Sequence, residues 1–113
     1  MNITDLVPGI ELRLQFNLRD WKFVPKSAGC YVLAKFDGEI LYIGLSDNLY
    51  RRFSEHRDSD TKRLPTRNGL AFWFYYLLCE TKELNRIERT WLNEHVTQHG
   101  VLPPLNKINS PVH

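Results

Sequence analysis

The chain has 113 residues, which is enough for one domain with its own hydrophobic core. Its hydrophobic content of 42%, charged content of 25% and net charge of +2 are ordinary for a globular protein and give only weak support for a polyanionic partner. No apolar run approaches the roughly 18 residues of a membrane span, and the first residues lack the basic start of a secretion signal. The composition therefore excludes a membrane-spanning helix, and we expect a cytoplasmic protein.

The N-terminal 27 residues carry a weak structural signal. Apolar and polar positions are mixed around Pro8-Gly9, and we predict a short helix after that break. Residues 25–29 then form a turn that leads into a strand. Cys30 and Cys79 both fall in segments of strand character. Because two cysteines make no disulfide framework and no His/Cys cluster has zinc-finger spacing, we expect two reduced thiols in the core.

Residues 30–36 and 39–43 have strand character and are separated by Asp37-Gly38. Asp-Gly between two such runs is a strong hairpin signal, because both residues tolerate positive φ. A two-residue turn predicts three facing pairs: Phe36 with Glu39, Lys35 with Ile40, and Leu33 with Tyr42. Tyr31 would then lie on the same face of the sheet as Tyr42, one diagonal and roughly 7–8 Å away.

Three further elements complete the predicted fold. Asp47 or Asn48 can cap a helix that runs to about Arg57, and residues 58–70 have the composition of a polar loop. Residues 71–79 are short and rich in aromatics, which is typical of a buried central strand. A second helix begins near Thr81 and ends near Gly100, and Pro103-Pro104 then lead into an extended tail.

This order of elements predicts an α/β fold of the α+β kind. A small three-stranded sheet, made of the hairpin and the central strand, would be flanked by helices. The chain shows no internal repeat and no interdomain linker, so the helices and the sheet should share one core.

Glu88 is the most informative single residue. It lies in the middle of an apolar stripe of the second helix, which is formed by Leu84, Ile87, Trp91 and Leu92. A carboxylate in that position is costly unless it is paired or bound to a cation. Spacing alone favours a salt bridge, for example to Arg52 or Arg89. The alternative is a metal ligand, because one carboxylate with waters and a phosphate oxygen suits Mg²⁺.

The other polar candidates are ambiguous when each is taken alone. Arg52 and His56 are four residues apart, so they share one flank of the first helix, where such a pair is more often surface decoration than a site. Tyr31 and Tyr42 are of a type that favours strands in any case. Asn106, after Pro-Pro-Leu, could simply cap a turn.

The combination resembles a known family. Gly29-Cys30-Tyr31 followed by Tyr42-Ile43-Gly44 is similar to the paired signature of the GIY-YIG endonucleases. Arg52, ten residues past Tyr42, resembles the family's arginine on the next helix, and His56 resembles the histidine found there in many members. Glu88 matches the glutamate of the later helix, and Asn106 matches the terminal asparagine.

Two positions depart from the family pattern. Cys30 replaces the usual isoleucine, which exchanges one buried apolar side chain for a smaller one. Leu45 follows the second triplet, where some relatives carry lysine or a small polar residue. If a cation is needed near the phosphate at that point, Lys35 or Arg51 would have to supply it.

The resemblance implies a metal-dependent endonuclease that hydrolyses a phosphodiester bond of DNA, with RNA left open as a substrate. It implies one Mg²⁺ or Mn²⁺ ion per active site, bound by Glu88. Arg52 would bind the phosphate, a tyrosine would deprotonate the attacking water, and His56 would assist that tyrosine. Asn106 would orient Glu88. Which tyrosine is the base stays open, and a non-cleaving nucleic-acid-binding module on the same fold is the alternative function.

The resemblance also divides the chain. Residues 1–27 form a partly helical N-terminal extension, residues 28–107 the catalytic domain, and residues 108–113 a tail. Basic side chains are in excess between residues 48 and 70. The residues expected to contact nucleic acid are Lys35, Arg51, Arg57, Lys62, Arg63 and Arg67. We expect so small a unit to obtain its specificity as part of a larger protein, as a homodimer or from a partner protein.

Overall fold

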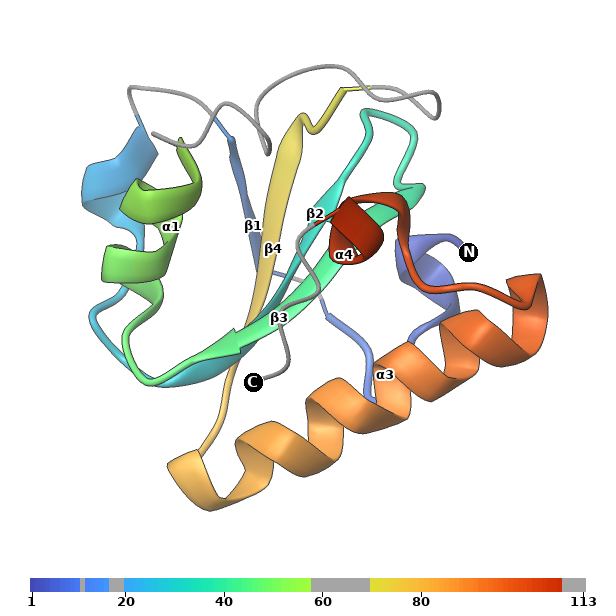
Figure 1. Cartoon of the computed structure of the whole chain (residues 1–113). Helices are drawn as coiled ribbons and strands as arrows, with labels where there is room; N and C mark the ends of the chain where they lie inside the picture. Colours follow the sequence, from blue (N-terminus) through green and yellow to red (C-terminus); the bar gives the residue numbers. More distant parts are fainter. Residues whose placement is uncertain (11, 17–19, 58–69, 109–113) are drawn as a thin grey trace.

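The computed structural model describes residues 1–10, 12–16, 20–57 and 70–108, without the side chains of Asp20, Trp21, His56, Arg57, Lys107 and Ile108. The elements follow one another as η1 (Ile3–Asp5), β1 (Leu12–Gln15), η2 (Asp20–Phe23), β2 (Gly29–Ala34), β3 (Ile40–Ser46), α1 (Leu49–Arg57), β4 (Trp73–Leu78), η3 (Thr81–Glu83), α3 (Leu84–His99) and α4 (Pro104–Ile108). The described strands form one sheet in the order β1-β4-β2-β3, and every neighbouring pair is antiparallel (Figure 1). The α+β class expected from the sequence is confirmed.

Helices cover both faces of this sheet. On one face α3 packs Leu84, Ile87 and Trp91 against Val32 and Ile43 of the hairpin. On the other face α1 packs its apolar edge, Leu49 and Phe53, into a second cluster that includes Leu33, Leu41, Phe74 and Leu105 of α4. Because side chains alternate between the two faces along each strand, the sheet contributes to two separate hydrophobic cores. β3 is an edge strand of this sheet, and α1 and α3 lie on opposite faces of it.

The expected N-terminal helix and the expected number of strands were wrong. The segment after Pro8-Gly9 contains strand β1, which pairs with β4 and gives the described part of the sheet four strands instead of three. The helical turn, η1, precedes Pro8 and is capped by the side chain of Asn2. Four residues of alternating polarity are too short a run to stand out as a strand until a partner is known. With β1 on its far side, β4 is the central strand that its composition predicted.

The β2–β3 hairpin has a different turn from the predicted one. Three residues, Phe36, Asp37 and Gly38, connect Lys35 to Glu39, whose backbone groups are joined by a hydrogen bond of 2.9 Å. Gly38 has φ +91°, which suits the left-handed position that closes a three-residue turn. The predicted facing of Phe36 with Glu39 was therefore wrong.

A bulge corrects the register further along. Ala34 pairs with Ile40, so the predicted pairing of Lys35 with Ile40 was wrong. Between Ala34 and Leu33 the register shifts by one residue. Leu33 then pairs with Tyr42, as predicted. The shift also lets Leu41 and Tyr42 contribute to the same core cluster, although they are adjacent in sequence.

Two predicted helix ends are confirmed, and one segment predicted to be extended is helical. Asn48 accepts a hydrogen bond of 3.1 Å from the backbone of Arg51 and caps α1, and Gly100 ends α3 with φ +75°. The tail expected to be extended after Pro103-Pro104 is instead the short helix α4. Proline is compatible with a first helical position, since its missing N–H would have no partner there. α4 packs against β3 (Figure 1).

Candidate active site

A cavity of about 260 Å³ opens at the edge strand β3. Its lining residues come from β2, β3, α1 and α3, and they are Tyr31, Tyr42, Gly44, Leu45, Arg52, Asn85 and Glu88. Four of the residues predicted for the site thus line one cavity, although they are up to 57 positions apart in the sequence (88 − 31). We refer to this cavity as the pocket.

The two tyrosines lie side by side on one face of the sheet, as predicted. Their ring centroids are 5.9 Å apart with an interplanar angle of 29°, and Tyr31 also stacks on Phe74 at 5.2 Å. Tyr31 is almost fully buried, with 1% of its surface exposed, whereas Tyr42 is half-buried. Of the two phenols, Tyr42 is therefore the more accessible to water.

Gly44 makes room for this arrangement. Tyr31 and Gly44 face each other across β2 and β3, and a Cβ atom at Gly44 would lie 2.5 Å from the hydroxyl oxygen of Tyr31 and 2.8 Å from a ring carbon of Tyr42. Real Cβ atoms essentially never approach that closely. The last glycine of the second triplet is thus required by the first tyrosine. The reason is steric, because Gly44 has no positive φ.

The pKa values of both phenols are raised. Burial raises the pKa of Tyr31 well above its ordinary value, and Tyr42 raises it further through its charge and a side-chain hydrogen bond. Burial also raises the pKa of Tyr42, but the hydrogen bond with Tyr31 and the charge of Arg52 lower it. Tyr42 is therefore the phenol that ionises more readily.

Arg52 presents an unused donor to the pocket. Among the described residues its Nε is buried and has no hydrogen-bond partner. A buried donor left unsatisfied costs about 1–3 kcal/mol, so a ligand with acceptor oxygens would stabilise this position. The preceding residue behaves differently, because Arg51 is exposed and forms ion pairs with Asp47 at 2.6 Å and Glu55 at 3.5 Å. The fold thus separates two adjacent arginines into a pocket residue and a surface residue.

Glu88 brings a carboxylate to the pocket from α3. It is half-buried, and the neighbouring Ile87 and Trp91 fix the helix against the sheet. Asn85 lines the same pocket one turn earlier and was not predicted. Its spacing of three residues from Glu88 could have identified it, because residues i and i+3 share a helix face. Cys30 contacts the start of the same helix, where its thiol donates to the carbonyl of Leu84 at 3.5 Å.

Asn106 contacts the backbone of β3. Its side-chain amide donates to the carbonyl of Ile43 and accepts from the N–H of Ile43, both at 2.9 Å. These two bonds occupy backbone groups on the open edge of the sheet, between Tyr42 and Gly44. The role predicted for Asn106 was to orient Glu88, but the bonds observed here position the strand that carries Tyr42.

The other residues predicted to contact nucleic acid or to assist catalysis do not line the pocket or lie outside the described part of the structure. Lys35 does not line the pocket; its ammonium is 3.0 Å from Glu39 and 3.7 Å from Asp37, and the hydrogen bond to Glu39 raises its pKa. Neither Lys35 nor Arg51 therefore compensates for Leu45 in the pocket, whereas Arg52 lines it. Five predictions fall outside the described part of the structure: the side chains of His56 and Arg57, and residues Lys62, Arg63 and Arg67.

The acidic and metal-binding side chains of the described residues are not clustered. No three His, Cys, Asp or Glu side chains there are grouped so that they could hold a metal ion. A site in this part of the chain would therefore rely on one carboxylate, Glu88, with other oxygen donors. No helix within the described ranges is both long and apolar enough to cross a membrane.

Comparison with known proteins agrees with this geometry. The family model of the GIY-YIG catalytic domain matches residues 27–100 of the 113-residue chain. The matched range contains all the residues that line the pocket and ends before Asn106 and α4. No curated protein matches the chain in sequence. The chain therefore belongs to the GIY-YIG family of nucleases, and residues 27–100 are its catalytic domain.

Proposed function

We propose that this chain is an endonuclease that hydrolyses a phosphodiester bond of DNA, using one divalent metal ion and a water molecule activated by a tyrosine. Membership of a nuclease family supports the reaction class. The observation that carries the proposal is the convergence of Tyr42, Arg52 and Glu88 on one pocket from three elements of the fold. Each supplies a group that phosphodiester hydrolysis requires: a base, a phosphate-binding cation and a metal-binding carboxylate.

The donor atoms of the pocket fit Mg²⁺ or Mn²⁺. Glu88 provides a carboxylate and Asn85 an amide oxygen, and hard divalent cations prefer such oxygen ligands, completed by water and substrate phosphate. With one carboxylate among the described lining residues, a single ion is favoured over a two-metal pair. When bound, the ion would neutralise the charge that develops on the phosphate.

Arg52 is the candidate phosphate ligand of the protein itself. Its guanidinium offers a planar set of donors that matches phosphate oxygens, and it keeps its charge at any physiological pH. The buried Nε without a partner among the described residues is the donor that a phosphate oxygen would satisfy. Binding there would orient the scissile phosphate next to the two phenols.

Tyr42 is the candidate base, because its side chain is the more accessible of the two and the hydrogen bond with Tyr31 lowers its pKa. Its raised pKa keeps the phenol protonated at neutral pH in the free protein, so Tyr42 needs positive charge nearby before it can accept a proton from water. Arg52 already lowers its pKa. The relay of that proton through His56 stays part of the proposal, and its side chain lies outside the described residues.

The alternative function is a nucleic-acid-binding module that does not cleave. It would keep the fold and the basic residues but would not turn over substrate. Specificity from a second copy or a partner protein is compatible with either function, and sedimentation of the purified chain with and without DNA would test for a second copy.

Cleavage itself decides between the two functions. Purified protein is incubated with linear, nicked and branched DNA, and with RNA, in the presence of Mg²⁺, Mn²⁺ or EDTA. The proposal expects strand scission of at least one DNA with either metal and none with EDTA. DNA binding without scission under every condition would establish the alternative, and metal-independent scission would contradict the metal role.

A further inference from the structure

The tip of the β2–β3 hairpin carries an exposed aromatic side chain, Phe36, which contacts the half-buried Phe72 and Trp73 outside the pocket. Phe36 has 72% of its surface exposed. Its ring meets Phe72 edge-to-face at 5.0 Å and Trp73 in a nearly parallel arrangement at 6.3 Å, and Phe72 and Trp73 meet at 4.8 Å. The guanidinium of Arg13 lies 3.8 Å from the centroid of the Trp73 ring. We call these four residues the tip patch.

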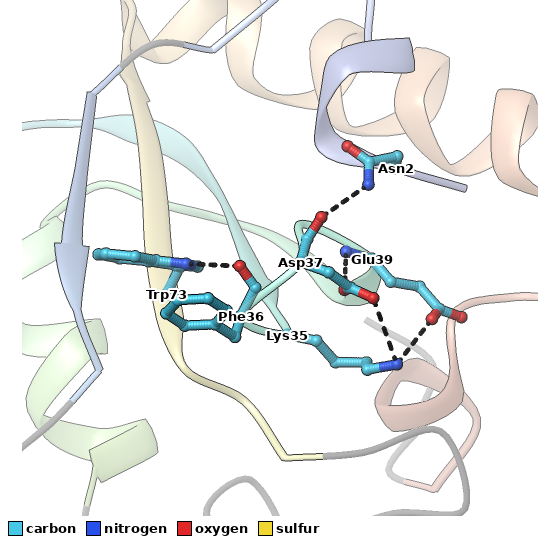
Figure 2. Close-up of polar contacts among 6 residues, drawn as sticks. All are labelled: Asn2, Lys35, Phe36, Asp37, Glu39 and Trp73. Atoms are coloured by element: carbon cyan, nitrogen blue, oxygen red, sulfur yellow. Dashed lines mark hydrogen bonds and ion pairs between the residues drawn. The ribbon is translucent and has the colours of Figure 1, made fainter.

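The tip patch is rigidly supported. The indole nitrogen of Trp73 donates to the carbonyl of Phe36 at 3.1 Å and ties the turn to β4 (Figure 2). On the other side of the turn, Asn2 donates to the carbonyl of Asp37 at 3.0 Å. An exposed aromatic ring on a backbone fixed from both sides is already in place for a ligand, so little conformational entropy would be lost on binding.

Charges at the tip patch are already paired. Lys35 contacts both Glu39 and Asp37, as Figure 2 shows, and Arg13 lies over Trp73 while donating to the hydroxyl of Tyr75 at 3.1 Å. Among the described residues, two cations and two acids leave this end of the hairpin without the net positive charge that a phosphate would require. The groups that remain available are flat and uncharged ring surfaces. A neutral, planar ligand therefore suits this surface better than the phosphate backbone.

An unpaired nucleobase has these properties. Proteins that bind single-stranded nucleic acid stack bases on aromatic side chains and on arginine planes, and a few such rings are enough. A stable protein partner would instead need roughly 800 Å² of complementary surface on this side, which three rings do not provide. The same hairpin also carries Tyr31 and Tyr42 of the pocket.

We infer that the tip patch binds an unpaired base of the DNA substrate by stacking, with Phe36 as the main contact. This inference rests on the proposed function, because it takes its ligand from the substrate. Phe36 is five residues beyond Tyr31, which is about 16 Å along a strand. At about 3.4 Å per stacked nucleotide, the base lies about five nucleotides from the scissile phosphate, or fewer if the strand is extended. The preferred substrate is then a DNA with a single-stranded arm, bulge or branch near the cleaved bond.

The test is a binding experiment in EDTA, where no cleavage occurs. The ligands are a fluorescent blunt duplex and a duplex of the same sequence with a single-stranded arm that carries 2-aminopurine at successive positions. The variants are Phe36→Ala, the aromatic replacement Phe36→Trp, and Phe23→Ala as a control at a similarly exposed phenylalanine of η2. Circular dichroism checks that each variant is folded. The hydrogen bond from Trp73 to the backbone of residue 36 is retained in all of them.

We expect Phe36→Ala to weaken binding of the armed duplex about tenfold while the affinity for the blunt duplex stays unchanged. Phe36→Trp and Phe23→Ala should bind both ligands as the wild type does, and quenching of 2-aminopurine should be strongest at one position and absent in Phe36→Ala. An unchanged preference in Phe36→Ala overturns the inference even if the protein cleaves DNA. Loss of self-association with unchanged DNA affinity would also overturn it and assign the tip patch to a protein contact. A wild-type protein that neither binds nor cleaves DNA removes the proposed function itself.

Discussion

The two ends of the β2–β3 hairpin have opposite chemistry. At the pocket, Arg52 has a buried donor without a partner among the described residues, and two phenols have raised pKa values. At the tip, Lys35 is paired with two acids and the exposed groups are rings. A hydrogen-bond donor is thus left without a partner among the described residues where a phosphate must be recognised, and charges are paired where a flat ligand fits. The comparison shows that the number of basic residues in a segment says little about phosphate binding until their partners are known.

The sharpest test of the pocket is Glu88→Gln. We expect it to reduce cleavage roughly a thousandfold, because the loss of the carboxylate removes the metal ligand that stabilises charge on the phosphate. The matched control is Glu94→Gln on the same helix, which is exposed and accepts a hydrogen bond from Gln98. Cleavage rates and calorimetry with Mn²⁺ measure the effect. If the Glu88→Gln variant keeps more than a tenth of the activity, Glu88 is a structural residue and the two ends of the hairpin differ less than proposed.

The next largest effect separates the two tyrosines. Tyr42→Phe should reduce cleavage roughly a hundredfold, since a general base is lost. Tyr31→Phe removes only the hydrogen bond to Tyr42 and should reduce cleavage less. The rate profile should shift to higher pH, because that bond lowers the pKa of Tyr42. Single-turnover rates between about pH 6 and pH 10 measure both the loss of rate and the shift of the pH profile. A larger loss for Tyr31→Phe would reverse the assignment.

Arg52→Lys tests whether the free donor matters beyond its charge. Lysine keeps the charge but not the planar fork, so we expect cleavage to fall about tenfold, the scale of one hydrogen bond to a charged group. Arg51→Lys is the control, because its guanidinium is exposed and already paired with acids. Equal effects of the two substitutions would mean that both arginines act only by attracting DNA, and that the buried Nε of Arg52 makes no specific contact with the phosphate.

Two glycines of the hairpin give the smallest expected effects. Gly44→Ala should destabilise the protein by about 1–3 kcal/mol and displace Tyr31, because the new methyl group meets the two phenols. Gly38→Ala should cost about 1 kcal/mol through its positive φ but leave the cleavage rate of the folded protein unchanged. Denaturant unfolding gives the stabilities. Equal loss of activity in both variants would show that the tip and the pocket are not independent.

Local signals predicted much of the fold. Asn48 and Gly100 mark helix ends through bonds and dihedral angles that involve near neighbours in sequence. The pairing of Leu33 with Tyr42 was predicted correctly because the bulge offsets the extra residue of the turn. The predicted turn itself was one residue too short. Because of that error, Phe36 was predicted to be a strand residue that faces Glu39. In the structure it lies in the turn and is exposed.

The family, the order of most elements and the placement of both tyrosines on one face could be predicted from the amino-acid sequence, because these depend on side-chain identity and on the period of a short hairpin. Three results required the folded chain: the buried Nε of Arg52 has no partner among the described residues, Asn106 bonds to Ile43, and Leu12–Gln15 pairs with β4. Two of these results are contacts between segments far apart in the chain. The other result depends on which polar atoms become buried when the chain packs. Neither distant pairing nor burial is encoded in the spacing of neighbouring residues.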